Sequence, residues 1–323
     1  MMADFNFSVF AGAAATTVAD TTLADVLDSA LRAADQTPRW DVTTSDFWCS
    51  VNPKGGLGSS QGWKLHLSAT PASAETVLTR SLPTLLAGGS AFKFARTTSH
   101  VAQLNGRNTS RGHSGKFITV YPEDDQEAVR LAEALHQATA GLPGPRVLSD
   151  RPYAPGSLVH YRYGAFVEER RLGNDGLYAW VIFDPDGNPV EDRRVGSYLP
   201  PSWVPCPFPT PVSDGAVGTK NSEEGILIGD RFLAREAIRH TNKGGVYRVV
   251  DIRDGGDAIV KEARPHVEAD EAGEDVRDML RAEARALEKI GPLGVAPRLF
   301  ELFEQSGHLF LAEELVPGVP LHQ

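Results

Sequence analysis

Residues 62–70 read GWKLHLSAT, and the alternation of their side chains predicts a β-strand with two different faces. Successive residues of a strand point to opposite sides, so Lys64 and His66 share one face while the apolar residues around them take the other. A lysine and a histidine on an otherwise apolar strand form an electropositive, titratable pair. The stretch therefore predicts a strand with a core face and a cationic face.

A second stretch, AFKFAR at residues 91–96, repeats this arrangement with Lys93 between two phenylalanines. If both strands share a sheet and a face, Lys64, His66 and Lys93 converge. Taken singly, a strand lysine is most often a surface residue whose stem covers apolar surface, and a single histidine is most often structural. Only eight residues of this chain are lysines, however, against 24 arginines. The combination therefore favours a functional site.

A glycine- and serine-rich loop follows at residues 107–122, RNTSRGHSGKFITVYP. Its backbone N–H groups, together with Arg111 and Lys116, suit an anion such as phosphate. The pattern GxxxxGK[ST] is missing, so the loop is not a P-loop, and an ordinary basic hairpin loop is the alternative interpretation. Arg162, within HYRYGAF at residues 160–166, is a further candidate, either as a phosphate fork or as a cation stacked on a neighbouring tyrosine.

Two lysines, a histidine and several arginines suit the elimination of phosphate from phosphoserine or phosphothreonine. Arginines hold the phosphate dianion through paired hydrogen bonds. A neutral lysine, its pKa depressed by neighbouring cations and burial, removes the weakly acidic α-proton. A second cation stabilises the developing enolate, and a protonated histidine supports the leaving phosphate.

Composition narrows the class of protein. The hydrophobic fraction of 41% and the charged fraction of 23% are those of a globular protein and exclude a wholly disordered, collagenous or coiled-coil chain. A formal net charge of −10 argues against non-specific binding to nucleic acid or to anionic membranes. The two cysteines, Cys49 and Cys206, are far apart, and no apolar stretch is long enough to span a bilayer. We therefore expect a cytoplasmic protein with no membrane and no nucleic-acid partner.

The 323 residues suit two domains. Six prolines between residues 200 and 211 mark the strongest boundary, because proline disfavours both helices and central strands. We predict a first domain over residues 1–205, a proline-rich linker over 206–225 and a second domain over 226–323. Helices are predicted over residues 22–34, 73–86, 123–140 and 274–290, and strands over 64–68, 91–96, 117–121, 158–163 and 178–183. Pro83 leaves open whether residues 73–86 form one helix or two short ones. The fold class is α+β, with a mixed or antiparallel sheet in the first domain.

In order and spacing, these pieces resemble the phosphothreonine lyase family of bacterial effectors and, more closely, the lyase domain of class III lanthipeptide synthetases. The matching pieces are GWKLHLSAT, the strand of Lys93, SRGHSGKFITVYP, LSD at residues 148–150 and YRYG at residues 161–164. The resemblance implies that Lys93 is the general base for the Cα proton. It implies that His66 is the general acid toward the leaving phosphate and that Lys64 polarises the substrate carbonyl.

The resemblance also implies phosphate- or substrate-binding roles for six residues: Arg111, Lys116, Arg162, Asp150, Arg107 and Arg151. Asp150 would orient a cation or the peptide. The implied partner is a phosphorylated precursor peptide, and the product is dehydroalanine or dehydrobutyrine, formed without a metal or other cofactor. The alternative is a non-catalytic module that binds a phosphopeptide or a leader peptide through the same cations.

Residues 226–323 resemble a protein-kinase N-lobe with five strands and one helix. TNKGGVYRV at residues 241–249 takes the place of the glycine-rich loop, AIVK contributes Lys261, and the helix containing LRAEARAL contributes Glu283 as its ion-pair partner. LFLAEELVPGVPL at residues 309–321 resembles the hinge, where Glu313 and Leu315 would supply backbone contacts to adenine. The alternative is an ordinary small α+β unit.

The chain contains no HRD, no asparagine downstream of one and no DFG, so the catalytic base and the Mg²⁺-binding residues of a kinase are missing. We therefore predict no kinase activity for this polypeptide and expect it to be a fragment of a longer synthetase. The vestigial nucleotide-binding residues would be Lys261, Glu283, Gly244, Gly245, Glu313 and Leu315. ATP and Mg²⁺ are expected only for the full-length kinase, and a leader peptide is expected at the kinase-like lobe.

Overall fold

The structure is a computed structural model, which describes residues 21–56, 58–167, 169–172, 176, 178–193, 197–209, 219–221 and 225–318. The chain forms two compact units. The first comprises Met1–Leu104 and Ser110–Pro211, and the second comprises Asn105–Thr109 and Val212–Gln323. Most of the predicted linker, residues 210–218 and 222–224, lies outside the described residues.

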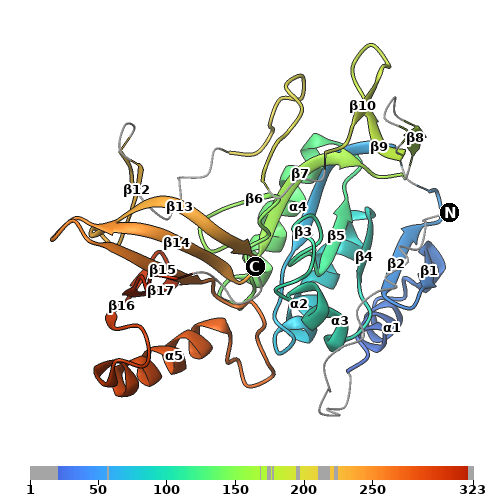
Figure 1. The fold of residues 1–323 in the computed structure, drawn as a ribbon. Coiled ribbons are helices and arrows are strands. Elements are labelled where there is room, and N and C mark those ends of the chain that lie inside the picture. Colours follow the sequence, from blue (N-terminus) through green and yellow to red (C-terminus); the bar gives the residue numbers. More distant parts are fainter. Residues whose placement is uncertain are drawn as a thin grey trace. The chain divides into compact units, whose positions relative to one another are not determined.

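The first unit is built on an antiparallel sheet with the strand order β1-β2-β4-β5-β3-β7-β6 (Figure 1). Every pairing between these strands is antiparallel, which confirms the α+β class. The strands are β1 (Trp40–Thr44), β2 (Trp48–Pro53), β3 (Gln61–Leu67), β4 (Ala91–Ala95), β5 (Ile118–Tyr121), β6 (Arg151–Pro152) and β7 (Val159–Ala165).

Four α-helices accompany this sheet in the described residues: α1 (Ala24–Ala33), α2 (Ala74–Gly88), α3 (Thr98–Leu104) and α4 (Asp125–Thr139). A short 3-10 helix, Thr37–Arg39, precedes β1. Helix α4 begins where the Asp124 side chain accepts a hydrogen bond from the backbone N–H of Glu127, which satisfies one of the free donors of its first turn. Helix α2 is continuous and contains Pro83 within its length.

The core of the first unit lies between the helices and one face of the sheet. The apolar residues of the β3 and β4 patterns, such as Leu65, Phe92 and Phe94, are fully buried there with Leu27 of α1 and Leu131 of α4. Burying one such side chain contributes about 1.5–3 kcal/mol. Because strand residues alternate, this burial turns the cationic residues of β3 and β4 to the opposite face of the sheet.

A second, smaller sheet extends the first unit beyond β7 (Figure 1). Its strands are β8 (Arg170–Leu172), β9 (Tyr178–Phe183) and β10 (Pro189–Glu191). A hairpin joins β9 to β10, and Asp184 organises its turn by accepting hydrogen bonds from the backbone N–H groups of Asp186 and Asn188. The side chain of Gln61 on β3 exchanges two hydrogen bonds with the backbone of Phe183, of 2.6 and 2.7 Å, and so ties the two sheets together.

The described part of the proline-rich stretch packs on the first unit. The Phe208 ring stacks on Tyr161, with 4.0 Å between ring centroids, and meets Trp63 edge-on. Phe208 is 5% exposed and belongs to the core of this unit. The predicted linker therefore begins with residues that pack against the core, because an aromatic ring among the prolines fills the space beside β7.

The second unit has one antiparallel sheet of seven strands among the described residues, in the order β11-β12-β13-β14-β15-β17-β16. The strands are β11 (Thr219–Asn221), β12 (Gly225–Ile228), β13 (Phe232–Thr241), β14 (Gly244–Asp251), β15 (Asp257–Ala263), β16 (Leu299–Gln305) and β17 (His308–Glu314). The prediction of five strands was wrong, because β11 and β12 add an antiparallel pair at the edge next to β13.

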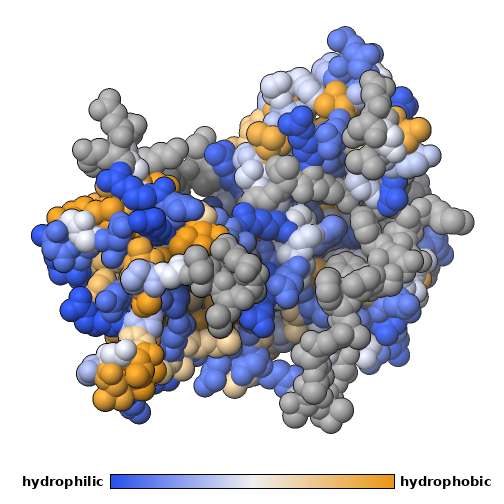
Figure 2. All heavy atoms as spheres, viewed as in Figure 1, coloured by the Kyte–Doolittle hydropathy of each residue, from blue (hydrophilic) through white to orange (hydrophobic). Residues whose placement is uncertain are grey.

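Helix α5 (Val276–Ile290) packs its apolar stripe on this sheet and leads into a 3-10 turn, Gly291–Leu293. It begins at a capping box in which Asp275 and Asp278 each accept a hydrogen bond from backbone N–H groups at the helix start. At the end of α5, Figure 2 shows an apolar patch where Ile290, Leu293 and Val295 are exposed. In the part of the chain that the structure describes, the helices are too short or too polar to cross a bilayer.

Candidate functional site

A row of polar side chains crosses the sheet of the first unit. Thr119 on β5 pairs with Lys93 on β4 at one side and with His66 on β3 at the other. The row continues from His66 to His160 on β7 and from Lys93 to Ser50 on β2. Directly opposed residues of antiparallel strands lie on the same face of the sheet. The structure thus places Lys93 and His66 on one face, two strand spacings or about 10 Å apart.

A second row lies beside the first. Lys64, two residues before His66, pairs with Arg162 on β7, two residues after His160. Because residues two apart on a strand share a face, Lys64 and Arg162 join the face that carries His66 and Lys93. Four predicted site residues from three strands therefore occupy one face of the sheet.

Asp150 lies at the centre of a buried charged cluster. Its Oδ2 is 2.5 Å from Nδ1 of His66, and its Oδ1 is 3.0 Å from Nζ of Lys116. The hydroxyl of Ser149 also donates to Oδ1 at 2.7 Å. The Asp150 side chain is 0% exposed, and those of His66 and Lys116 are 5% and 7% exposed. A buried carboxylate needs such partners, since an unpaired charge in the interior is strongly unfavourable.

The cluster fixes the protonation state of its members. Burial alone would raise the pKa of Asp150, but Lys116 and His66 hold that pKa well below its ordinary value. An ionised carboxylate only accepts hydrogen bonds, so the proton of the short contact lies on Nδ1 of His66. Burial, assisted by the charge of Lys116, lowers the pKa of His66 from 6.5 to about 3. At neutral pH the imidazole is therefore uncharged, with a free lone pair on Nε2.

This neutral state in the free protein differs from the protonated form expected during elimination, and the role of His66 as general acid stays a prediction. The strand pattern showed which face His66 occupies but not that Lys116 and the surrounding chain would remove it from water. Lys116 has a partner that the sequence did not reveal, and its phosphate-binding role stays a prediction. Its ammonium compensates the buried charge of Asp150, whereas the sequence predicted a phosphate-binding cation at the mouth of a loop.

Each lysine of the proposed chemistry lies over an aromatic ring. Nζ of Lys93 is 4.7 Å from the ring centroid of Trp48, and Nζ of Lys64 is 5.8 Å from that of Tyr121. Both lysines are only partly exposed. Cation–π contact at these distances restricts where each amine can lie. The two amines are thus held near the sheet surface at its cationic face.

Three arginines from the prediction have different surroundings. The Nη2 atom of Arg111 is buried and has no hydrogen-bond partner among the described residues. Arg151 is exposed and stacks on Tyr198, with its Cζ 4.9 Å from the ring centroid. Arg107 belongs to the segment that groups with the second unit, where its Nε lies 3.3 Å from Oε1 of Glu268. Of the three, Arg111 is therefore the one with a buried donor that lacks an acceptor among the described residues.

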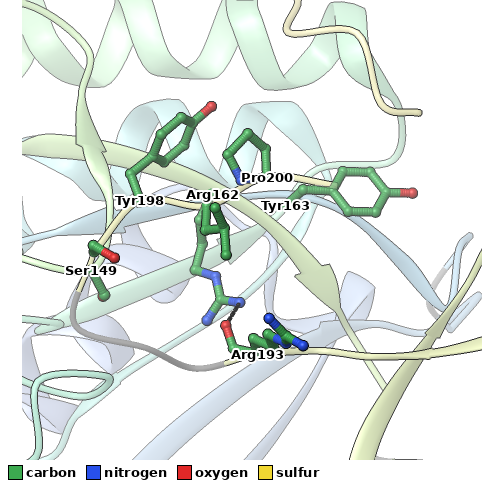
Figure 3. Close-up of a pocket in the computed structure, with 8 residues that line it drawn as sticks. Ser149, Arg162, Tyr163, Arg193, Tyr198 and Pro200 are labelled. Carbon is green, nitrogen blue, oxygen red and sulfur yellow. Dashed lines mark hydrogen bonds between the residues drawn. The ribbon is translucent and has the colours of Figure 1, made fainter. Parts of the chain in front are cut away.

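Arg162 lines a pocket at the edge of β7 (Figure 3). Its Nη2 donates to Oδ1 of Asp192 at 2.6 Å and to the backbone oxygen of Arg193 at 3.4 Å. The other lining residues are Ser149, Tyr163, Arg193, Ser197, Tyr198, Leu199 and Pro200. The pocket therefore lies between Arg162 on β7 and the chain segment that follows β10.

In the second unit, Lys261 on β15 contacts two carboxylates. Its Nζ is 2.7 Å from Oε1 of Glu283 on α5 and 2.6 Å from Oε1 of Glu313 on β17. Burial alone would lower the pKa of Lys261, but the hydrogen bonds to both carboxylates outweigh it and raise that pKa. The register puts Glu313 on the face that carries Lys261, so its side chain binds the lysine. Leu315 follows the end of β17.

Gly244 and Gly245, the two glycines of the predicted loop, lie where β14 closely approaches β15. A Cβ on Gly244, whose φ is 150°, would lie 1.8 Å from the backbone oxygen of Glu262 on the neighbouring β15. The backbone N–H of Gly245 donates to Oε2 of Glu262 at 2.9 Å. A phosphate-binding loop needs free N–H groups, and this one is already used within the unit. Gly244 thus lets β14 approach β15 closely.

Reasoning from sequence missed His160, Thr119 and Asp192. His160 is 2% exposed, accepts a hydrogen bond from the backbone N–H of Val147 at Nε2 and bonds the Leu158 oxygen through Nδ1. Burial lowers its pKa to about 4. The alternation of His160 with Arg162 in HYRYG could have revealed its face. Thr119 and Asp192 have no such signal, since only strand pairing brings them to the site.

The fold and these rows define an α+β domain with a buried His–Asp–Lys cluster on a cationic sheet face. Residues 28–217, more than half of the chain, match the N-terminal domain family of RamC. The chain is 36% identical over 284 residues to a Streptomyces coelicolor protein described as a probable SapB synthase. That alignment covers 88% of this chain and 30% of the relative, so the chain spans less than a third of that protein's length.

The chain belongs to the RamC N-terminal domain family. The resemblance to class III lanthipeptide synthetases, which the motifs of the first domain indicated, is thereby confirmed.

Proposed function

We propose that the first unit is a phosphoserine/phosphothreonine lyase that acts on a precursor peptide in lanthipeptide biosynthesis. The single observation that supports it best is the shared sheet face of Lys93, His66, Lys64 and Arg162, with the Asp150 cluster behind His66. Elimination needs a base, an acid and a phosphate-binding group within one substrate length, and this face carries a candidate for each of the three roles.

In the proposed reaction, the neutral amine of Lys93 takes the Cα proton of the phosphorylated residue. The electron pair of the broken Cα–H bond forms the Cα=Cβ double bond, the Cβ–O bond breaks and its electrons leave with the phosphate. Lys64 stabilises the charge that develops on the substrate carbonyl oxygen. The products are inorganic phosphate and dehydroalanine or dehydrobutyrine. Side chains supply every group in this scheme, which we propose to be independent of metal and cofactor.

The neutral state of His66 in the free protein determines how the acid must work. Because its pKa is about 3, the imidazole has no spare proton at pH 7. A phosphate monoester has a second pKa near about 6, so part of the substrate arrives as a monoanion with a proton to share. We propose that the negative charge of the bound phosphate raises the pKa of the imidazole, so that Nε2 receives this proton and then returns it to the leaving oxygen. Asp150 holds Nδ1 and stabilises the transient imidazolium.

Phosphate binding falls to Arg162 and Arg111 in this proposal. The buried, unpaired Nη2 of Arg111 supports it, since a buried donor without an acceptor is costly unless a ligand satisfies it.

The test is to incubate the chain with a synthetic phosphoserine or phosphothreonine peptide and to follow the loss of phosphoric acid by mass spectrometry. We expect a mass loss for the wild-type chain and none for Lys93→Ala. Elimination at the wild-type rate by both Lys93→Ala and His66→Ala would refute the mechanism.

A second candidate is a binding module that recognises a phosphopeptide or leader peptide without turnover. The uncharged His66 favours it, because a site without an acid in its free state still binds phosphate through its arginines. The same assay separates the two functions. Saturable phosphopeptide binding with no dehydrated product after long incubation would support the binding module.

For the second unit, the proposal is a kinase-like N-lobe with a vestigial nucleotide site. The contact between Lys261 on a strand and Glu283 on α5 supports the kinase-like assignment. Two carboxylates on Lys261 and the occupied N–H of Gly245 weigh against phosphate binding. We expect no shift in melting temperature with excess ATP and Mg²⁺, because a ligand stabilises only a folded protein that binds it. A clear shift that Lys261→Ala abolishes would contradict this.

A further inference from the structure

Asp192, which follows β10, is a buried acid in contact with an arginine proposed to bind phosphate. Its Oδ1 accepts from Nη2 of Arg162 at 2.6 Å, and its Oδ2 accepts from the backbone N–H of Ala165 at 3.3 Å. Its own backbone N–H donates to the oxygen of Trp180 at 2.8 Å. The side chain is 2% exposed. Asp192 is therefore fixed by its backbone to β9 and by its carboxylate to β7.

The backbone of β7 makes room for this carboxylate at Gly164. A Cβ at Gly164 would lie 3.1 Å from Oδ2 and 3.2 Å from Oδ1 of Asp192, closer than ordinary contact. Any residue with a side chain at position 164 would crowd the carboxylate of Asp192. The contact between the small sheet and β7 thus depends on a glycine at the position after Tyr163.

Arg162 meets the protein through one nitrogen. Within the described residues its hydrogen bonds all leave from Nη2, to Asp192 and to the backbone oxygen of Arg193, as Figure 3 shows for the second. Its Nε and Nη1 donors remain for a ligand of the pocket that Arg162 lines. A guanidinium held by one edge keeps its remaining donors in a fixed plane, which suits recognition of a phosphate.

We infer that Asp192 is a positioning residue, which holds Arg162 so that its free donors face the phosphate of the substrate. This inference rests on the proposed lyase function. A competing role is a latch, in which Asp192 occupies Arg162 until phosphate displaces it. The anchoring of Asp192 at both its backbone and its carboxylate favours positioning, because a latch has to move away.

The test is the elimination kinetics of Asp192→Asn with a synthetic phosphoserine peptide. This change keeps the shape of the side chain and an oxygen for the Ala165 N–H but removes the charge that holds Arg162. Positioning predicts a KM raised at least fivefold with kcat within twofold of wild type. The matched control is Asp186→Asn, an exposed acid in the β9–β10 turn, which should leave both constants unchanged.

A double-mutant cycle shows whether Asp192 acts through Arg162. Arg162→Gln alone and Arg162→Gln with Asp192→Asn should have the same KM, because the partner is already lost. Gly164→Ala is a second probe that pushes the carboxylate without changing any charge, and it should raise KM in the same direction. It keeps the inference testable if Asp192→Asn does not fold.

Three outcomes would overturn the inference: an Asp192→Asn KM equal to that of wild type, a KM below it as a latch requires, or additive effects in the cycle. If the wild-type chain itself releases no phosphate, the proposed function fails instead. The dissociation constants of the phosphopeptide for the same variants then decide the role of Asp192 by the same pattern.

Discussion

Nδ1 of His66 and Oδ2 of Asp150 lie 2.5 Å apart, although 84 positions separate the two residues in the chain, and neither side chain is more than 5% exposed. With Lys116 on the other carboxylate oxygen, this contact joins β3, the loop before β5 and the loop before β6. The pair thus serves stability and the proposed chemistry at once.

Asp150→Asn should destabilise the first unit. The change leaves the Lys116 ammonium buried without its counter-charge, and breaking such a pair costs about 3–5 kcal/mol. We expect the free energy of unfolding in urea to fall by that amount. Tryptophan fluorescence is a suitable signal, since all five tryptophans lie between residues 40 and 203, within the first unit.

The matched control is Glu127→Gln, which breaks the more exposed contact of Glu127 with Arg130 on α4. Pairs of that kind contribute about 0–1 kcal/mol. Equal losses for Asp150→Asn and Glu127→Gln would show that the buried cluster has no special role in stability.

Acid should weaken the first unit well before its carboxylates titrate. His66 and His160 have pKa values lowered to about 3 and about 4, whereas unfolded histidines titrate near about 6.5. Between these values the unfolded chain binds protons that the folded chain does not. Each histidine therefore costs about 1.4 kcal/mol of stability per pH unit as the pH falls from about 6.5 toward 4.

Urea unfolding followed by tryptophan fluorescence at pH 7.0, 6.0 and 5.0 measures this slope. His66→Asn should make it shallower, since one of the two proton-binding differences is removed. The depressed pKa of Asp150 acts in a different range, because an unfolded aspartate titrates only near about 3.9. A free energy of unfolding that stays constant over this pH range would contradict the neutral, buried state of both histidines.

Lys93→Arg should abolish elimination as Lys93→Ala does, with a loss of about 10²–10⁴ in rate. Arginine keeps the positive charge and can still stack on Trp48, but it does not lose its proton in proteins and so cannot act as a base. Mass spectrometry of the phosphopeptide gives the rate. Lys54→Arg, the same change at an exposed lysine, is the control and should retain full activity. An active Lys93→Arg chain would assign the base elsewhere.

Removal of divalent metal should not slow elimination. In the proposed scheme, arginine and lysine side chains balance the charge of the phosphate and of the developing enolate. We expect the rate of phosphate release in excess EDTA to match the untreated rate within twofold. Loss of activity in EDTA that returns with added Mg²⁺ would require a metal step that the scheme does not contain.

The helices and strands with strong periodic patterns were predictable. β9 has the predicted bounds, and α1, α2, α4 and α5 lie within or close to their predicted ranges. The misses have physical causes. β1 exposes every residue except Trp40, so it lacks an alternating pattern. α3 has only seven residues, too few for a helical period to show.

The candidate site divides in the same way. The spacing of Lys64 and His66 alone assigns both residues to one face of a strand. In the same way, alternation places Lys93 on the face opposite to its phenylalanine neighbours. Asp192 and Thr119 could not be found, because no local pattern distinguishes a buried aspartate that binds an arginine from one in a turn. Their roles depend on contacts between distant segments.

The sequence by itself determined which side chains share a strand face, because that alternation follows from the covalent geometry of an extended chain. Only the tertiary structure decided that β5 places Thr119 between Lys93 and His66, and that Lys116 and Asp150 close around the imidazole. Strand order, register and burial arise from long-range packing. They set the distances between the charges and the access of water to them, and so they decide that His66 is neutral in the free protein.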